Sequence, residues 1–79
     1  MDDGVRNVTF GGENFLGIRS MDNKDAVSFI EIFDIETRHP VAKVTYDRRD
    51  GAMAIITFRE GVSRRIVEEL FKRADEYLV

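Results

Sequence analysis

The fold is decided by the stretch VAKVTYDRRDGAMAIITFR, residues 41–59. Two runs rich in β-branched and apolar residues, 41–47 and 52–59, flank Arg48-Arg49-Asp50-Gly51, a pattern typical of a β-hairpin. We expect a three-residue loop over 49–51 with Gly51 in the left-handed conformation. This register pairs Val44 with Ile56 and gathers six apolar side chains on one hairpin face. They are Ala42, Val44, Tyr46, Ala54, Ile56 and Phe58. A two-residue loop at Asp50-Gly51 would shift the pairing by one and mix the two faces, so we reject it.

Three further strands are predicted before this hairpin, over residues 5–10, 15–20 and 26–36. Gly11-Gly12 and the polar segment 21–25 separate them as turns. Gly17 inside the second strand indicates a bulge or a close backbone approach. Pro40 donates no ladder hydrogen bond, so it belongs at the start of the hairpin's first strand.

A helix is predicted over residues 63–78, with Ser63 as its N-cap. Its apolar residues recur at helical spacing, and they are Ile66, Val67, Leu70, Phe71, Ala74, Tyr77 and Leu78. This stripe needs the sheet as its partner surface. The fold class is therefore α+β: a single antiparallel β-meander of four to five strands with one C-terminal amphipathic helix packed on one sheet face. We expect one domain spanning residues 1–79.

Composition limits the classes of protein that remain. With 43% hydrophobic and 34% charged residues, the 79-residue chain is not a disordered tail. It has no cysteine, which excludes a disulfide framework and any thiolate metal site. Its net charge of −3 is mild and argues neither for a protein that wraps nucleic acid nor for an anionic substrate trap. The acidic start Met1-Asp2-Asp3-Gly4 is unlike a signal peptide, and no apolar run could span a bilayer, so a soluble cytoplasmic protein without membrane contact is expected.

The residues that enzymes use are sparse. The single histidine, His39, precedes a proline in a turn, which is typical of a solvated side chain. Asp22-Asn23-Lys24-Asp25 places a lysine where a calcium loop needs oxygen. Gly11-Gly12 is followed by neither a lysine nor a helix, as a phosphate loop requires. We therefore expect a non-enzymatic protein with no catalytic residue, cofactor or metal.

The strand over 26–36 is apolar on both faces: Phe29 and Phe33 point one way, Ile30 and Ile32 the other. The predicted register places Met53 and Ile55 with the two isoleucines, away from the helix. An exposed apolar patch of Ile30, Ile32, Met53 and Ile55 would mark an association surface, so we expect an interaction module that forms a homodimer through this face or an edge strand. In the alternative, sheet twist and residues 5–10 cover the patch.

Two further functions rest on charge. A basic set at the hairpin and the helix start could contact nucleic acid or an acidic protein; it comprises Lys43, Arg48, Arg49, Arg59, Arg64 and Arg65. Asp47, Asp50 and Glu60 lie in the same region, so a merely solvated set is the favoured interpretation. The order of strands followed by a helix resembles that of small dimeric single-stranded DNA-binding coactivators. An inhibitor or immunity-type protein would instead dock through acidic residues: Asp22, Asp25, Glu31, Asp34 and Glu36.

Overall fold

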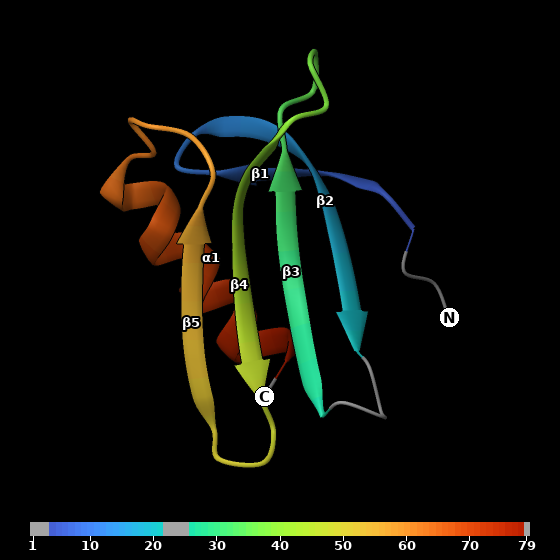
Figure 1. The fold of residues 1–79 in the computed structure, drawn as a ribbon. Coiled ribbons are helices and arrows are strands. Elements are labelled where there is room, and N and C mark those ends of the chain that lie inside the picture. Colours follow the sequence, from blue (N-terminus) through green and yellow to red (C-terminus); the bar gives the residue numbers. More distant parts are fainter. Residues whose placement is uncertain (1–3, 22–25, 79) are drawn as a thin grey trace.

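In a computed structural model, which describes residues 4–21 and 26–78, the chain forms a five-stranded antiparallel sheet followed by one helix (Figure 1). The strands lie side by side in chain order, β1-β2-β3-β4-β5. The elements are β1 (Arg6–Phe10), β2 (Glu13–Met21), β3 (Val27–Phe33), β4 (Pro40–Asp47), β5 (Ala52–Thr57) and α1 (Arg64–Tyr77). The predicted α+β meander with a C-terminal helix is confirmed.

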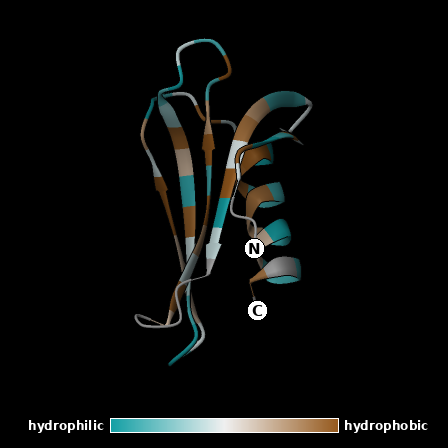
Figure 2. Ribbon diagram, turned by 90° about the vertical axis from the view of Figure 1, so that its right-hand side faces the viewer, coloured by the Kyte–Doolittle hydropathy of each residue, from teal (hydrophilic) through white to brown (hydrophobic). Residues whose placement is uncertain are grey.

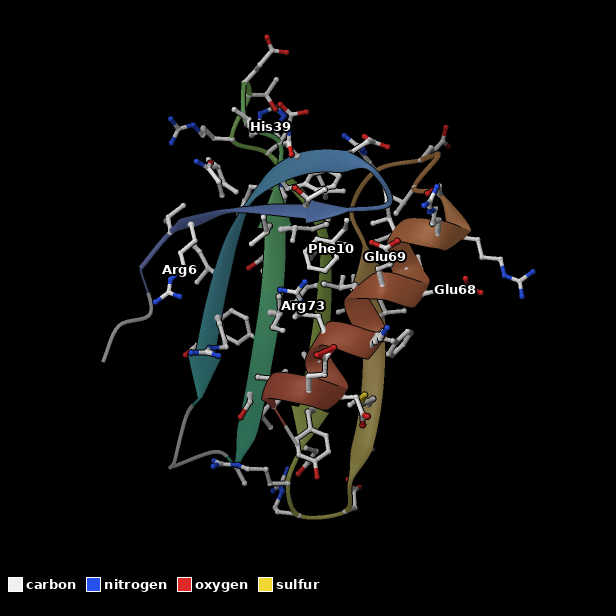
Figure 3. The ribbon with its side chains drawn as sticks, turned by 180° about the vertical axis from the view of Figure 1, so that it is seen from behind. Arg6, Phe10, His39, Glu68, Glu69 and Arg73 are labelled. Atoms are coloured by element: carbon white, nitrogen blue, oxygen red, sulfur yellow. The ribbon has the colours of Figure 1, made fainter. Side chains whose placement is uncertain are left out.

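Helix α1 covers one face of the sheet and leaves the other without a helix (Figure 2). β1 and the start of β2 curl toward the helix side, and β1 contacts α1 there (Figure 3). The buried core lies between these layers and consists of Phe10, Phe15, Ile30, Ile32, Val41, Ala42, Val44, Ile66, Leu70, Ala74 and Leu78. The helix contributes its i, i+4 stripe to this core, as an amphipathic helix on a sheet does.

The helix begins as the sequence predicts. Ser63 has extended backbone angles, and its side-chain oxygen accepts a hydrogen bond from the Ile66 amide at 3.2 Å. The β1–β2 turn is fastened to the same end of the helix, because the Gly11 amide donates to Glu69 Oε1 at 2.8 Å. This bond fixes β1 against the helix and closes the core at that end.

The predicted register of the β4–β5 hairpin is wrong by one residue. Val44 pairs with Ile55, Tyr46 with Met53, and Asp47 with Ala52, so the loop has four residues, 48–51. Asp47 stabilises this loop: its backbone oxygen accepts from the Gly51 amide at 2.8 Å, and its carboxylate accepts from the Arg49 amide at 2.9 Å. Gly51 has the predicted left-handed backbone, with φ of 75°.

The third strand is shorter than the predicted 26–36. It ends at Phe33 because the Asp34 carboxylate accepts hydrogen bonds from the Glu36 and Thr37 amides and turns the chain. Pro40 opens β4, as expected. The irregular pairing lies between Ile32 and Phe33. Pairing at Gly17 is regular, so a bulge there is not found.

Candidate functional surfaces

The predicted apolar patch lies on the wrong face of the sheet. Ile30 and Ile32 are buried beneath α1, and Met53 and Ile55 are half-buried against the same core. The one-residue shift of the hairpin explains the correction for Met53 and Ile55, since it moves every side chain of β5 to the opposite face. Ile30 and Ile32 pair with Val44 and Ala42 of β4, so they share the helix-side face of these two buried residues. The alternative, in which residues 5–10 fold over these isoleucines, describes the structure better, because Val8 and Phe10 of β1 pack in this core.

The face without a helix carries the other set of side chains. One row across the sheet pairs Ile18, Glu31, Lys43 and Ile56, so an acidic and a basic side chain stand opposite each other between two isoleucines. The Lys43 Nζ lies 4.4 Å from the centroid of the Phe29 ring in the next row. Figure 1 looks onto this face, with α1 behind the sheet. The face thus mixes apolar and polar side chains around a central pair of opposite charges.

Strand β5 forms one edge of the sheet. All six of its residues, Ala-Met-Ala-Ile-Ile-Thr, are uncharged, and none is proline. Ile56 and the following Phe58 keep 50% and 46% of their surfaces exposed, although both were predicted to lie beneath the helix. Charged residues, proline and bulges are the usual means by which proteins protect a sheet edge from pairing with another chain. β5 has none of the three.

The edge also presents backbone donors. The Phe58 amide donates to the Val41 oxygen of β4 at 2.9 Å. Amides alternate in direction along an antiparallel strand, so those of Met53, Ile55 and Thr57 point away from β4. These three amides and the carbonyl groups beside them are positioned to pair with an added strand.

The basic residues predicted to act together are separated. Arg48 and Arg49 lie at the β4–β5 loop, whereas Arg64 and Arg65 lie at the start of α1, toward the other end of the molecule. Lys43 is on the uncovered face. Several of these residues form ion pairs with acidic neighbours among the described residues: Arg49 with Asp47, Arg59 with Glu13 and Asp34, Arg64 with Glu68, and Arg65 with Glu69. The set does not form one basic surface.

The acidic candidates are dispersed as well. Glu31 is on the uncovered face, and Asp34 and Glu36 belong to the β3–β4 turn. The Thr37 and Glu36 amides hold the pKa of Asp34 below its ordinary value. Asp22 and Asp25 lie outside the described residues.

His39 is exposed in the β3–β4 turn (Figure 3). In the described ranges 4–21 and 26–78, no three His, Cys, Asp or Glu side chains are grouped as a metal ion would need. Within the same part of the chain, no helix has the length and apolar content required to cross a membrane.

Comparison of the chain with protein-family models, curated proteins and solved structures finds no match.

Proposed function

We propose that the protein is a non-enzymatic protein-interaction module that associates with a second copy of itself through strand β5. The observation that carries the proposal is the unprotected edge of β5, with its uncharged sequence and its exposed Ile56 and Phe58. Such an edge is a template for pairing with another strand.

A second copy of the chain is the partner that best fits the β5 edge. Two identical strands that pair antiparallel about a twofold axis present the same residues to each other, which is the geometry of most homodimers. The outward amides of Met53, Ile55 and Thr57 then find carbonyl partners in the other copy, and the two sheets join into one. Ile56 of each copy is removed from water at the junction, where it is now half exposed.

The uncovered face supports the same arrangement. Its charges, Glu31 and Lys43, are of opposite sign and adjacent in one row, so the face does not repel a second copy. A small protein also benefits from association, since a 79-residue chain buries a limited core by itself.

Sedimentation equilibrium of three variants tests the proposal. Ile56→Lys places a charge at the β5 edge, and Thr57→Pro removes an outward amide without removing a hydrogen bond to β4. Val5→Lys is the matched control, because it makes the same exchange of an exposed apolar residue (57% exposed) for lysine beside β1, the opposite edge strand.

At tens of micromolar we expect twice the 9.1 kDa chain mass for the wild type and for Val5→Lys. Ile56→Lys and Thr57→Pro should give the monomer mass with unchanged circular dichroism. A monomeric wild type, or equal dissociation of Val5→Lys and Ile56→Lys, contradicts the proposal.

A further inference from the structure

Along the face that has no helix, the side chains at the β5 edge change from small to large. Ala52 and Ala54 come first, and Ile56 and Phe58 follow. Phe58 continues the alternation of the strand, because its amide still donates to the Val41 oxygen of β4 at 2.9 Å. Both alanines are exposed, and so are Ile56 and Phe58. The edge of one copy thus offers two small residues at one end and two large residues at the other.

The backbone limits how a second copy of β5 can be added. Two antiparallel strands exchange hydrogen bonds between residues whose amides both face the partner strand, here Met53, Ile55 and Thr57. All three find partners within the two strands if the twofold axis passes at Ile55. Ile55 then pairs with Ile55 of the second copy, and Met53 pairs with its Thr57.

The neighbouring registers leave amides unpaired. An axis at Ala54 places Thr57 opposite Gly51 of the second copy, and Gly51 has a left-handed backbone, with φ of 75°, in the hairpin loop. An axis at Ile56 places Met53 opposite Arg59 of the second copy, which lies beyond the end of β5. The extended part of β5 therefore favours the axis at Ile55.

The side chains favour the same axis. With Ile55 at the axis, Ile56 lies opposite Ala54 of the second copy, and Phe58 lies opposite its Ala52. Each large exposed side chain then lies beside a small one, which leaves room for it and allows it to be removed from water. An axis at Ile56 would instead place the two Ile56 side chains directly opposite each other.

We infer that β5 is a self-complementary strand, and that two copies pair antiparallel with the twofold axis at Ile55. This inference rests on the proposed association through β5 and specifies its register. In the resulting ten-stranded sheet the two uncovered faces become one continuous face, with Ala54 and Ile56 of both copies at its centre.

Disulfide formation between cysteine variants tests the register, since the chain has no cysteine of its own. Residues directly opposite in an antiparallel pair have Cα atoms about 4.5–5.5 Å apart, which a disulfide can bridge, whereas diagonal neighbours are about 7–8 Å apart, which it cannot. An axis at Ile55 places the thiols of Ala54→Cys and Ile56→Cys opposite each other. These two variants should therefore form a disulfide-bonded dimer when they are mixed, and neither should do so alone. Intact mass identifies the mixed dimer.

Two controls accompany this experiment. A mixture of Val5→Cys and Ala54→Cys measures random oxidation, because Val5 is exposed but precedes β1 at the opposite edge of the sheet, and it should give no mixed dimer. Sedimentation equilibrium of the reduced variants shows whether each still associates. In the wild type, an isotope-filtered NOE experiment on mixed labelled and unlabelled chains should detect contact between Ala54 of one copy and Ile56 of the other.

The outcomes separate the register from the association itself. If Ala54→Cys alone or Ile56→Cys alone forms the disulfide, the axis lies at that residue, so the inference is wrong while association through β5 stands. A wild-type dimer without the Ala54–Ile56 contact, whose variants form no mixed disulfide, also overturns it. A monomeric wild type overturns the association and the register together.

Discussion

Replacing Gly11 by alanine tests how the β1–β2 turn is seated on the helix. Gly11 has φ of 60°, and a Cβ there would lie 2.7 Å from Ile66 Cγ1 and 3.3 Å from the Ile66 backbone nitrogen. Ile66 is 1% exposed, and its amide is held by the Ser63 cap, so it cannot yield toward solvent. We expect about 1 kcal/mol from the left-handed backbone and about 1–3 kcal/mol from overpacking, together about 2–4 kcal/mol of lost stability.

Gly12→Ala is the control for the backbone contribution. Gly12 also has a positive φ, of 81°, but no atom lies within 4 Å of a Cβ built there. Its loss should be limited to about 1 kcal/mol. Urea unfolding followed by circular dichroism measures both, and the difference between the two variants should be about 1–3 kcal/mol. Equal losses would refute the reasoning that Gly11 is required by its contact with the helix.

Three other sets of substitutions test which sheet face is buried, how Asp47 stabilises the β4–β5 loop, and whether the buried Ser28 hydroxyl lacks a hydrogen bond. Ile32→Ala should cost about 2–5 kcal/mol because Ile32 is fully buried, whereas Ile56→Ala, measured at low protein concentration, should cost about 1 kcal/mol or less; similar losses in urea would contradict the assignment of faces. The side chain and then the amide of Arg49 lower the pKa of Asp47 from 3.8 to about 2, so Asp47 stabilises the fold above pH 3.8 and this contribution disappears as the pH falls toward 2. The acid unfolding curve of Asp47→Asn should therefore lack the loss of stability between pH 3.8 and about 2. If its stability depends on pH as that of the wild type does, ionised Asp47 does not stabilise the fold. Ser28→Ala should raise the free energy of unfolding by about 1 kcal/mol, since Ser28 Oγ is buried with no hydrogen-bond partner among the described residues; a loss of stability would show that the hydroxyl is satisfied.

Much of the fold follows from local signals in the sequence. Ser63 before an apolar helical stripe fixes the helix start, and Pro40 fixes the start of β4. Gly51 marks the hairpin loop, and its left-handed backbone is found in the structure. These signals depend on residues that are close in sequence, so they are reliable without knowledge of the tertiary fold.

The hairpin register is not determined by the same signals. Gly51 can take the left-handed position in a loop of three or four residues, so it does not select between them. The apolar pattern does not select either, because β5 carries Met53 and Ile55 on one face and Ala54 and Ile56 on the other. The selection comes from Asp47, whose carboxylate and backbone oxygen both accept loop amides.

A pocket between β1, β2 and α1, lined in part by arginines, was also beyond prediction from the sequence. Arg6, Arg19 and Arg73 are far apart in the chain and follow no motif spacing. They line one pocket because β1 curls toward the helix side of the sheet, where Val8 and Phe10 pack in or against the core.

Hydrogen exchange in β5 tests the central claim most directly. If two copies pair through this edge, the amides of Met53, Ile55 and Thr57 should exchange slowly at high protein concentration and rapidly on dilution. Ala54 and Ile56 serve as internal controls, since their amides point toward β4 and should be protected at both concentrations. Rapid exchange of the three outward amides at every concentration, with Ala54 and Ile56 protected throughout, would contradict self-association through β5.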